Sequence, residues 1–168
     1  MKHFKLTTET KISVLGVKLF RVEATIDFDC IEKGSKGGWV ESLSNLSGNA
    51  EVSGNACVYG NAEVSGNARV YGNARVSGDA EVSGNAEVYG NDRVSGNAEV
   101  SGEVFTLNIG YSLTLTDNHI QYGCKIKTVL EWGVWLDSDN VILTSRSSDK
   151  FKLIEMSLRL AIEQHRQR

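Results

Sequence analysis

The sequence predicts a mainly β protein: a solenoid of six-residue units, with β caps before and after it and an α-helix at the C-terminal end. Two observations predict this class. A six-residue pattern runs from residue 46 to residue 99 without a slip, and the 168 residues include 17 glycines but no proline. A short unbroken period with glycine at a fixed position is typical of a chain that turns at regular intervals.

The repeat comprises nine units, which begin with LSGNAE at Leu46 and end with VSGNAE at Glu99, and a degenerate tenth unit, VSGEVF, follows. A period of six fits neither one long helix nor a flat hairpin array. If each unit forms a short strand and a corner, its aliphatic first residue and its alanine point inward. The Gly-Asn pair then fits the corner, because both residues tolerate positive φ. Three such units close one coil of 18 residues.

The pattern of an aliphatic residue, turn residues and a small residue resembles the hexapeptide-repeat, left-handed parallel β-helix. Stacked coils are expected about 4.8 Å apart, with asparagine ladders along the corners. The nearly uniform VSGNAE and VYGNAR units, preceded by GGWVE at Gly37 and NLS at Asn45, make residues 37–102 similar to small β-helix proteins of phages and prophages, described loosely as transferase-like or polymer-forming. That similarity implies a phage accessory protein that binds and blocks a host factor, for instance a CRISPR or other defence component.

The repeat and its flanks divide the chain into four predicted segments. These are an N-terminal β cap (1–39), the β-helix (40–105), a C-terminal β segment (106–146) and an amphipathic helix (147–168). Trp39 is expected to cover the apolar core of the first coil. After the repeat, strands are expected over 105–115 and 122–145, the latter including Trp132–Leu136 and Val141–Leu143.

The last segment has the pattern of a helix that begins at Ser147 or Ser148. Its apolar face includes Phe151, Ile154, Leu158 and Leu160. This face either packs on the second cap or pairs with other copies of the chain. Because hexapeptide β-helices are often homotrimers, the resemblance implies a homo-oligomer, either a dimer or a trimer.

The predicted β-helix is acidic: residues 39–105 carry three basic and nine acidic side chains, a net charge of −6. Nucleic acid is therefore a poor partner for its faces, because affinity for phosphate comes from clustered Lys and Arg. Residues 18 apart in the sequence should stack in columns. The outward columns are Glu51, Arg69 and Glu87; Cys57, Arg75 and Arg93; and Glu63, Glu81 and Glu99.

The column of Glu63, Glu81 and Glu99 is a candidate partner-binding surface. Three carboxylates at this spacing repel one another. The column is therefore either a solvated face that keeps the protein soluble or a negative stripe presented to a basic protein partner.

Tyr71 and Tyr89 form a second candidate surface, together with Arg75 and Arg93 on the same predicted side of the coil. Tyrosine with arginine is the composition of interface hot spots. Ordinary cross-strand stacking explains the two tyrosines equally well.

Asp92 breaks the repeat, because it takes the place of the small inward residue in VYGNDR. A buried carboxylate must be desolvated or must twist the corner. Asp92 marks either a local distortion in a drifted repeat or a functional pocket. The first interpretation expects the substitution Asp92→Ala to stabilise the protein.

Enzymes of the hexapeptide β-helix group are mostly acyltransferases with a histidine as general base, and related carbonic anhydrases bind zinc through three histidines. Here His3, His119 and His165 all lie outside the repeat. The three cysteines form no CxxC pair, so reduced thiols are expected rather than a disulfide framework or a zinc ribbon. We therefore expect no metal, no cofactor and no catalytic site.

The sequence thus predicts a non-enzymatic binding protein of phage or prophage type that blocks a bacterial defence complex by protein–protein contact. Neither a signal peptide nor a membrane-spanning segment is expected, which places the protein in the cytoplasm of a bacterial host cell. A hexapeptide-repeat acyltransferase and a self-assembling structural β-helix are the alternatives.

Overall fold

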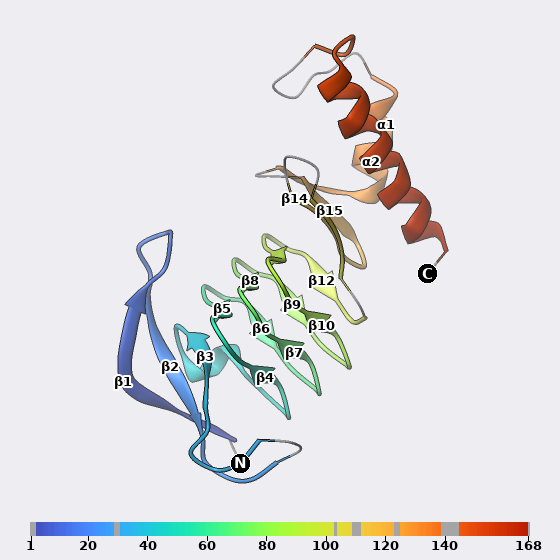
Figure 1. The fold of residues 1–168 in the computed structure, drawn as a ribbon. Coiled ribbons are helices and arrows are strands. Elements are labelled where there is room, and N and C mark those ends of the chain that lie inside the picture. The colour runs from blue at the N-terminus through green and yellow to red at the C-terminus, as the bar shows by residue number, and fades with distance from the viewer. Residues whose placement is uncertain are drawn as a thin grey trace. The chain divides into compact units, whose positions relative to one another are not determined.

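The computed structural model describes residues 3–28, 31–102, 104–108, 112–122, 125–138 and 145–167. The chain is mainly β, and it folds as two compact units, Met1–Val104 and Phe105–Arg168 (Figure 1). The predicted N-terminal cap and repeat belong to the first unit. The predicted C-terminal β segment and helix belong to the second.

The repeat forms a β-solenoid of stacked parallel strands. Each strand has two residues: β4 (Glu51–Val52), β5 (Cys57–Val58), β6 (Glu63–Val64), β7 (Arg69–Val70), β8 (Arg75–Val76), β9 (Glu81–Val82), β10 (Glu87–Val88), β11 (Arg93–Val94) and β12 (Glu99–Val100). Each strand pairs with the strand three units away, for example Glu63 with Glu81. The predicted coil of 18 residues is therefore confirmed.

Three faces result from this register, and we name them by their outward charges. The mixed face consists of β4, β7 and β10, and the acidic face of β6, β9 and β12. The basic face consists of β5, β8 and β11, which share one sheet with strands of the N-terminal cap. The three outward columns predicted from the sequence are confirmed by the strand registers.

The inside of the solenoid is filled by valine and alanine, as the repeat predicts. The first and fifth residues of the units are buried, for example Val70 and Ala74, each with none of its surface exposed. Asparagine ladders follow the corners: Asn49 Nδ2 donates to Asn67 Oδ1 at 3.1 Å, and Asn67 Nδ2 donates to Asn85 Oδ1 at 3.2 Å. These amides bond from coil to coil and so fix the stacking of the corners.

The N-terminal cap is an antiparallel sheet of β1 (Phe4–Ile12), β2 (Lys18–Ala24) and β3 (Lys36–Val40), and a 3₁₀ turn, Leu43–Asn45, leads into the first coil. β3 pairs in parallel with β5, which places Val40 beside Val58 inside the coil and Trp39 beside Cys57 outside it. The prediction that Trp39 covers the core was wrong, because strand alternation turns its side chain outward. Lys11 Nζ lies 4.5 Å and Arg21 Cζ 5.3 Å from the centre of the Trp39 ring.

The second unit consists of one antiparallel sheet and two helices. Its strands, paired in chain order, are β13 (Phe105–Asn108), β14 (Ser112–Leu115), β15 (His119–Tyr122) and β16 (Lys125–Thr128), and its helices are α1 (Val129–Leu136) and α2 (Asp149–Arg166). Buried residues of β14, β15, α1 and α2 form one apolar core. Among the described residues, no helix is both long enough and apolar enough to cross a membrane.

The expectation of a strand at Trp132–Leu136 was wrong, because this segment belongs to α1. The Thr128 hydroxyl accepts a hydrogen bond from Glu131 N at 3.1 Å, and the Glu131 carboxylate accepts one from Thr128 N at 2.8 Å. This capping box starts the helix and places Trp132 and Trp135 on its buried side. The strand expected at Val141–Leu143 lies outside the described residues.

Helix α2 begins as predicted, since the Ser148 hydroxyl accepts a hydrogen bond from Phe151 N at 3.1 Å. Phe151, Ile154 and Leu158 are buried in the core of their own unit. Of the two predicted alternatives, these three residues therefore follow the first, packing within the chain, and not pairing with other copies. Leu160 remains 46% exposed.

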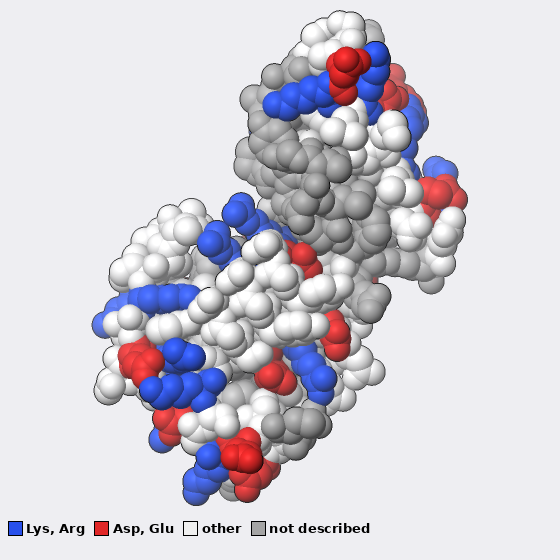
Figure 2. Space-filling view, viewed as in Figure 1, with Lys and Arg blue, Asp and Glu red and all other residues white. Residues whose placement is uncertain are grey.

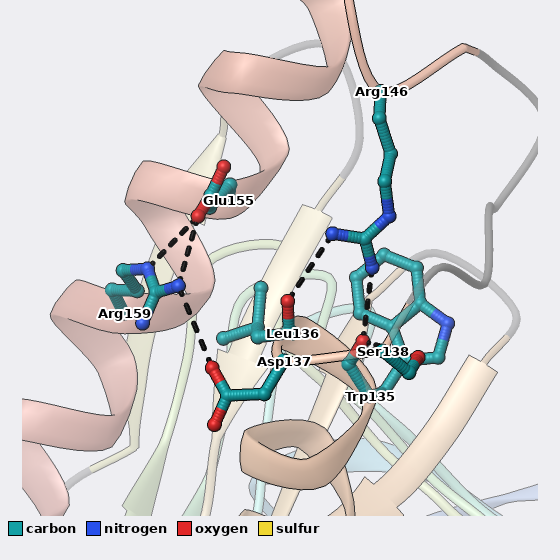
Figure 3. Close-up of polar contacts among 7 residues, drawn as sticks. All are labelled: Trp135, Leu136, Asp137, Ser138, Arg146, Glu155 and Arg159. Atoms are coloured by element: carbon teal, nitrogen blue, oxygen red, sulfur yellow. Dashed lines mark hydrogen bonds and ion pairs between the residues drawn. The ribbon is translucent and has the colours of Figure 1, made fainter.

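Arg146 bonds the C-terminal end of α1 (Figure 3) and also contacts Phe151 of α2. Its guanidinium donates to Trp135 O at 3.0 Å and to Leu136 O at 3.2 Å, and it lies over the rings of Trp135 and Phe151. The last carbonyl groups of a helix have no hydrogen-bond partner within the helix. A cation at this end donates hydrogen bonds to them and is attracted by the negative end of the helix dipole.

Candidate binding faces of the solenoid

The mixed face presents a column of alternating charge formed by Glu51, Arg69 and Glu87. Arg69 Nε lies 3.9 Å from Glu51 Oε2. Figure 2 shows acidic and basic atoms alternating where Figure 1 draws β4, β7 and β10. Opposite charges at adjacent positions attract, so this column is favourable within a single chain.

A groove of ≈ 490 Å³ lies along the mixed face. It is lined by the charged column, by one asparagine ladder and by Phe28 of the N-terminal cap: Phe28, Asn49, Glu51, Asn67, Arg69, Asn85 and Glu87. The Phe28 ring packs 4.8 Å from the His3 ring and 5.3 Å from the Phe4 ring, measured between ring centres. No sequence pattern predicts this groove, because Phe28 lies outside the repeat and reaches the mixed face only through tertiary contact.

Tyr71 and Tyr89 stack as predicted, with ring centres 5.5 Å apart and an interplanar angle of 14°. The Tyr71 hydroxyl donates to Glu87 Oε2 at 3.3 Å. The tyrosine pair therefore contacts the charged column of the mixed face. Tyr89 is 43% exposed and is available to a partner.

Burial raises the pKa of the Tyr71 phenol above its usual 10.0, and the nearby charge of Glu87 raises it further. The protonated phenol is thus favoured in the folded state, so the Tyr71 contribution to stability is present below pH 10.0 and is lost as the pH rises through the raised pKa. We expect the 295 nm absorbance difference between wild type and Tyr71→Phe to titrate above pH 10.0. Glu87→Gln should lower this midpoint, and an unchanged midpoint would contradict the assigned contact.

The other two faces carry like charges in register. Glu63, Glu81 and Glu99 are exposed on the acidic face, and neighbouring members occupy directly paired strand positions. On the basic face Arg75 pairs with Arg93. Arg75 and Arg93 therefore lie on a different face from the charged column that Tyr71 contacts.

Asp92 is 5% exposed, yet its corner is not distorted. Asp92 N donates to Tyr89 O at 3.0 Å, as Ala86 N donates to Ser83 O at 3.1 Å, and β11 keeps its register. The interpretation as a distorted repeat was therefore wrong. The Asp92 carboxylate accepts a hydrogen bond from Tyr89 N at 3.3 Å, whereas Ser83 N, at the same position in the preceding unit, donates to Val100 of the next coil.

We therefore expect Asp92→Ala to lower the free energy of unfolding by about 1–2 kcal/mol, because it removes the acceptor of the Tyr89 amide. Asp92→Asn keeps an acceptor oxygen and should retain more than half of that stability. Urea unfolding of the three proteins measures both differences. If Asp92→Ala is instead more stable than the wild type, the buried carboxylate destabilises the fold, as the interpretation of a drifted repeat expects.

His3 belongs to the first unit, where its ring packs against that of Phe28, whereas His119 and His165 belong to the second unit. His165 Nε2 lies 2.6 Å from Asp117 O, and His119 Nδ1 lies 2.7 Å from Asn118 Oδ1, all within the second unit. Over the part of the chain that the structure describes, no three side chains of His, Cys, Asp or Glu are grouped to hold a metal ion. Cys57 is a buried free thiol, and Cys30 and Cys124 lie outside the described residues.

No model of a known protein family matches the chain, and no curated protein matches it.

Proposed function

We propose that the chain is a non-enzymatic protein-binding module, and that its partner contacts the mixed face. The observation that carries this proposal is the position of the stacked Tyr71–Tyr89 pair against a charged column that lines a groove. Tyrosine and arginine supply much of the energy of protein interfaces, because they combine large contact area with hydrogen bonds.

The geometry of this face favours a protein over a small molecule. The groove is open, and polar side chains from three successive coils line it. The coils are tied together by strand pairing and by the asparagine ladder. A face held rigid in this way loses little conformational entropy when a partner docks.

We further propose that the solenoid is a left-handed parallel β-helix of the hexapeptide-repeat type, and that the protein is a phage-type inhibitor of a bacterial defence complex in the host cytoplasm. The resemblance of residues 37–102 to small phage β-helix proteins supports this part of the proposal. The carboxylates of Glu51 and Glu87 favour a partner that presents basic side chains to the groove.

The test is capture of a partner from bacterial lysate on the tagged protein, with identification by mass spectrometry. Tyr71→Ser/Tyr89→Ser is a conservative variant, because serine occupies the same position in other units, such as Ser65 and Ser83. We expect one stoichiometric partner that binds the wild type and is lost from this variant.

The matched control is Glu63→Gln/Glu81→Gln/Glu99→Gln, which changes the acidic face alone and should keep the partner. Loss of the partner in this control and not in the serine variant would move the binding site to the acidic face. No partner at all, together with turnover of acetyl-coenzyme A, would replace the proposal by the acyltransferase alternative.

A further inference from the structure

The acidic and basic faces each carry a column of like charges that is unfavourable within one chain. Directly paired positions in adjacent coils lie about 4.8 Å apart. Glu63 and Glu81 occupy such positions on the acidic face, and Arg75 and Arg93 on the basic face. Like charges directly opposite each other destabilise a sheet.

The mixed face shows that the same scaffold can pair its charges, since Arg69 lies between two glutamates and reaches Glu51. The arginines of the basic face have no glutamate in their own column. Within the described ranges, neither the Arg75 nor the Arg93 side chain takes part in an ion pair. Opposite charge for this column must therefore come from outside those ranges or from another molecule.

The two columns match each other in spacing and in height. Both repeat once per coil, because both follow the 18-residue register. Arg75 precedes Glu81 by six residues, and Arg93 precedes Glu99 by six residues. Six residues are one third of a coil, so the members of each pair differ in height by about 1.6 Å.

We propose that the acidic face of one copy of this chain docks on the basic face of a second copy. When two copies stand side by side with parallel coil axes and are offset by about 1.6 Å along them, the glutamates of one lie level with the arginines of the other. Lys11 lies over Trp39 in the same sheet as β5, β8 and β11 and adds positive charge beside the basic face, whereas Arg21, which also lies over Trp39, is ion-paired with Glu9 of that sheet.

This contact is heterologous, because two different surfaces meet, so each copy keeps one free acidic face and one free basic face until a ring closes. It uses neither the groove nor the tyrosine pair. The inference therefore goes beyond the proposed function, and either one can fail without the other. Exposed ion pairs are individually weak and are screened by salt, so association should depend on concentration and on salt.

The experiment is static light scattering of the full chain at high protein concentration. At about 0.01 M salt, where charges interact over about 30 Å, we expect the mean mass to be at least about twice the 18.4 kDa of one chain. At about 1 M salt, where that range shrinks to about 3 Å, the mass should return to that of the monomer.

Two charge reversals then test the pairing itself. Arg75→Glu/Arg93→Glu leaves both faces acidic, and Glu81→Arg/Glu99→Arg leaves both faces basic, so each variant alone should remain monomeric at low salt. An equimolar mixture should associate again, because each contact then joins opposite charges. Circular dichroism of each variant checks that the fold is kept, and association of the mixture shows that both variants fold.

Three results would overturn the proposal. The first is a wild-type mass of one chain at low salt. The second is an assembly that survives high salt and both reversals, which would place the contact elsewhere, for example on the exposed Leu153, Met156 and Leu160 of α2. The third is a mixture that stays monomeric while the basic face binds a single-stranded oligonucleotide, which would assign that face to nucleic acid.

Discussion

Replacing Trp132 by alanine is expected to lower the free energy of unfolding of the second unit by about 3–5 kcal/mol. Its side chain is fully buried in the core of that unit, and its indole Nε1 donates to Ile120 O at 2.6 Å. The substitution therefore leaves a large cavity and also removes the hydrogen bond that joins α1 to β15.

Near-ultraviolet circular dichroism during urea unfolding measures this effect, because the tryptophans of the second unit contribute to that signal. The matched control is Leu130→Ala on the same helix, where the side chain is 78% exposed and its loss should change stability by less than about 0.5 kcal/mol. Equal effects of the two substitutions would show that α1 does not pack on the sheet through Trp132.

Gly66→Ala is expected to lower the free energy of unfolding of the solenoid by about 3 kcal/mol or more. Its φ of +67° costs an alanine about 1–2 kcal/mol. The added Cβ would also lie 3.0 Å from both Gly84 N and Gly84 O in the next coil. To make room, the paired coils would have to separate by a few tenths of an ångström at this corner, which strains the hydrogen bond that Gly84 O accepts from Asn67 N at 2.8 Å.

Gly90→Ala separates the two causes. Gly90 has a similar φ of +62°, but a Cβ there would meet nothing within 4 Å. We expect this variant to lose only the conformational term of about 1–2 kcal/mol. Thermal unfolding followed by far-ultraviolet circular dichroism compares the two variants, and an equal loss would mean that the coils separate easily at Gly66.

The solenoid was predictable because each unit repeats the same local choice. Valine and alanine at fixed positions gave the inside of the coil, and the period of six gave the columns, from Glu63 beneath Glu81 to Tyr71 beside Tyr89. Outside the repeat, the direction of each side chain depends on strand pairing rather than on a sequence period. Trp39 is an example. Because Val40 points into the coil, strand alternation turns the neighbouring Trp39 side chain outward, so Trp39 does not cover the coil end.

The second unit shows a different cause of error. Trp132 to Leu136 is rich in aromatic and branched residues, which favour strands when counted one by one. The sequence nevertheless contains Thr128 and Glu131 in capping-box spacing, a helix-start signal that would have predicted α1. The Phe28 wall of the groove had no such signal, because it depends on how the cap folds against the repeat.

The 18-residue register also limits how the length of such a protein can vary. Removing residues 64–81 as a block would take out one full coil and leave every remaining side chain on its original face. Removing only 64–69 would keep the pattern of valine and alanine, but Glu81 would then follow Cys57 in the column of the basic face. Length changes of whole coils thus preserve the surface chemistry, whereas changes of a single unit preserve the fold and exchange the faces.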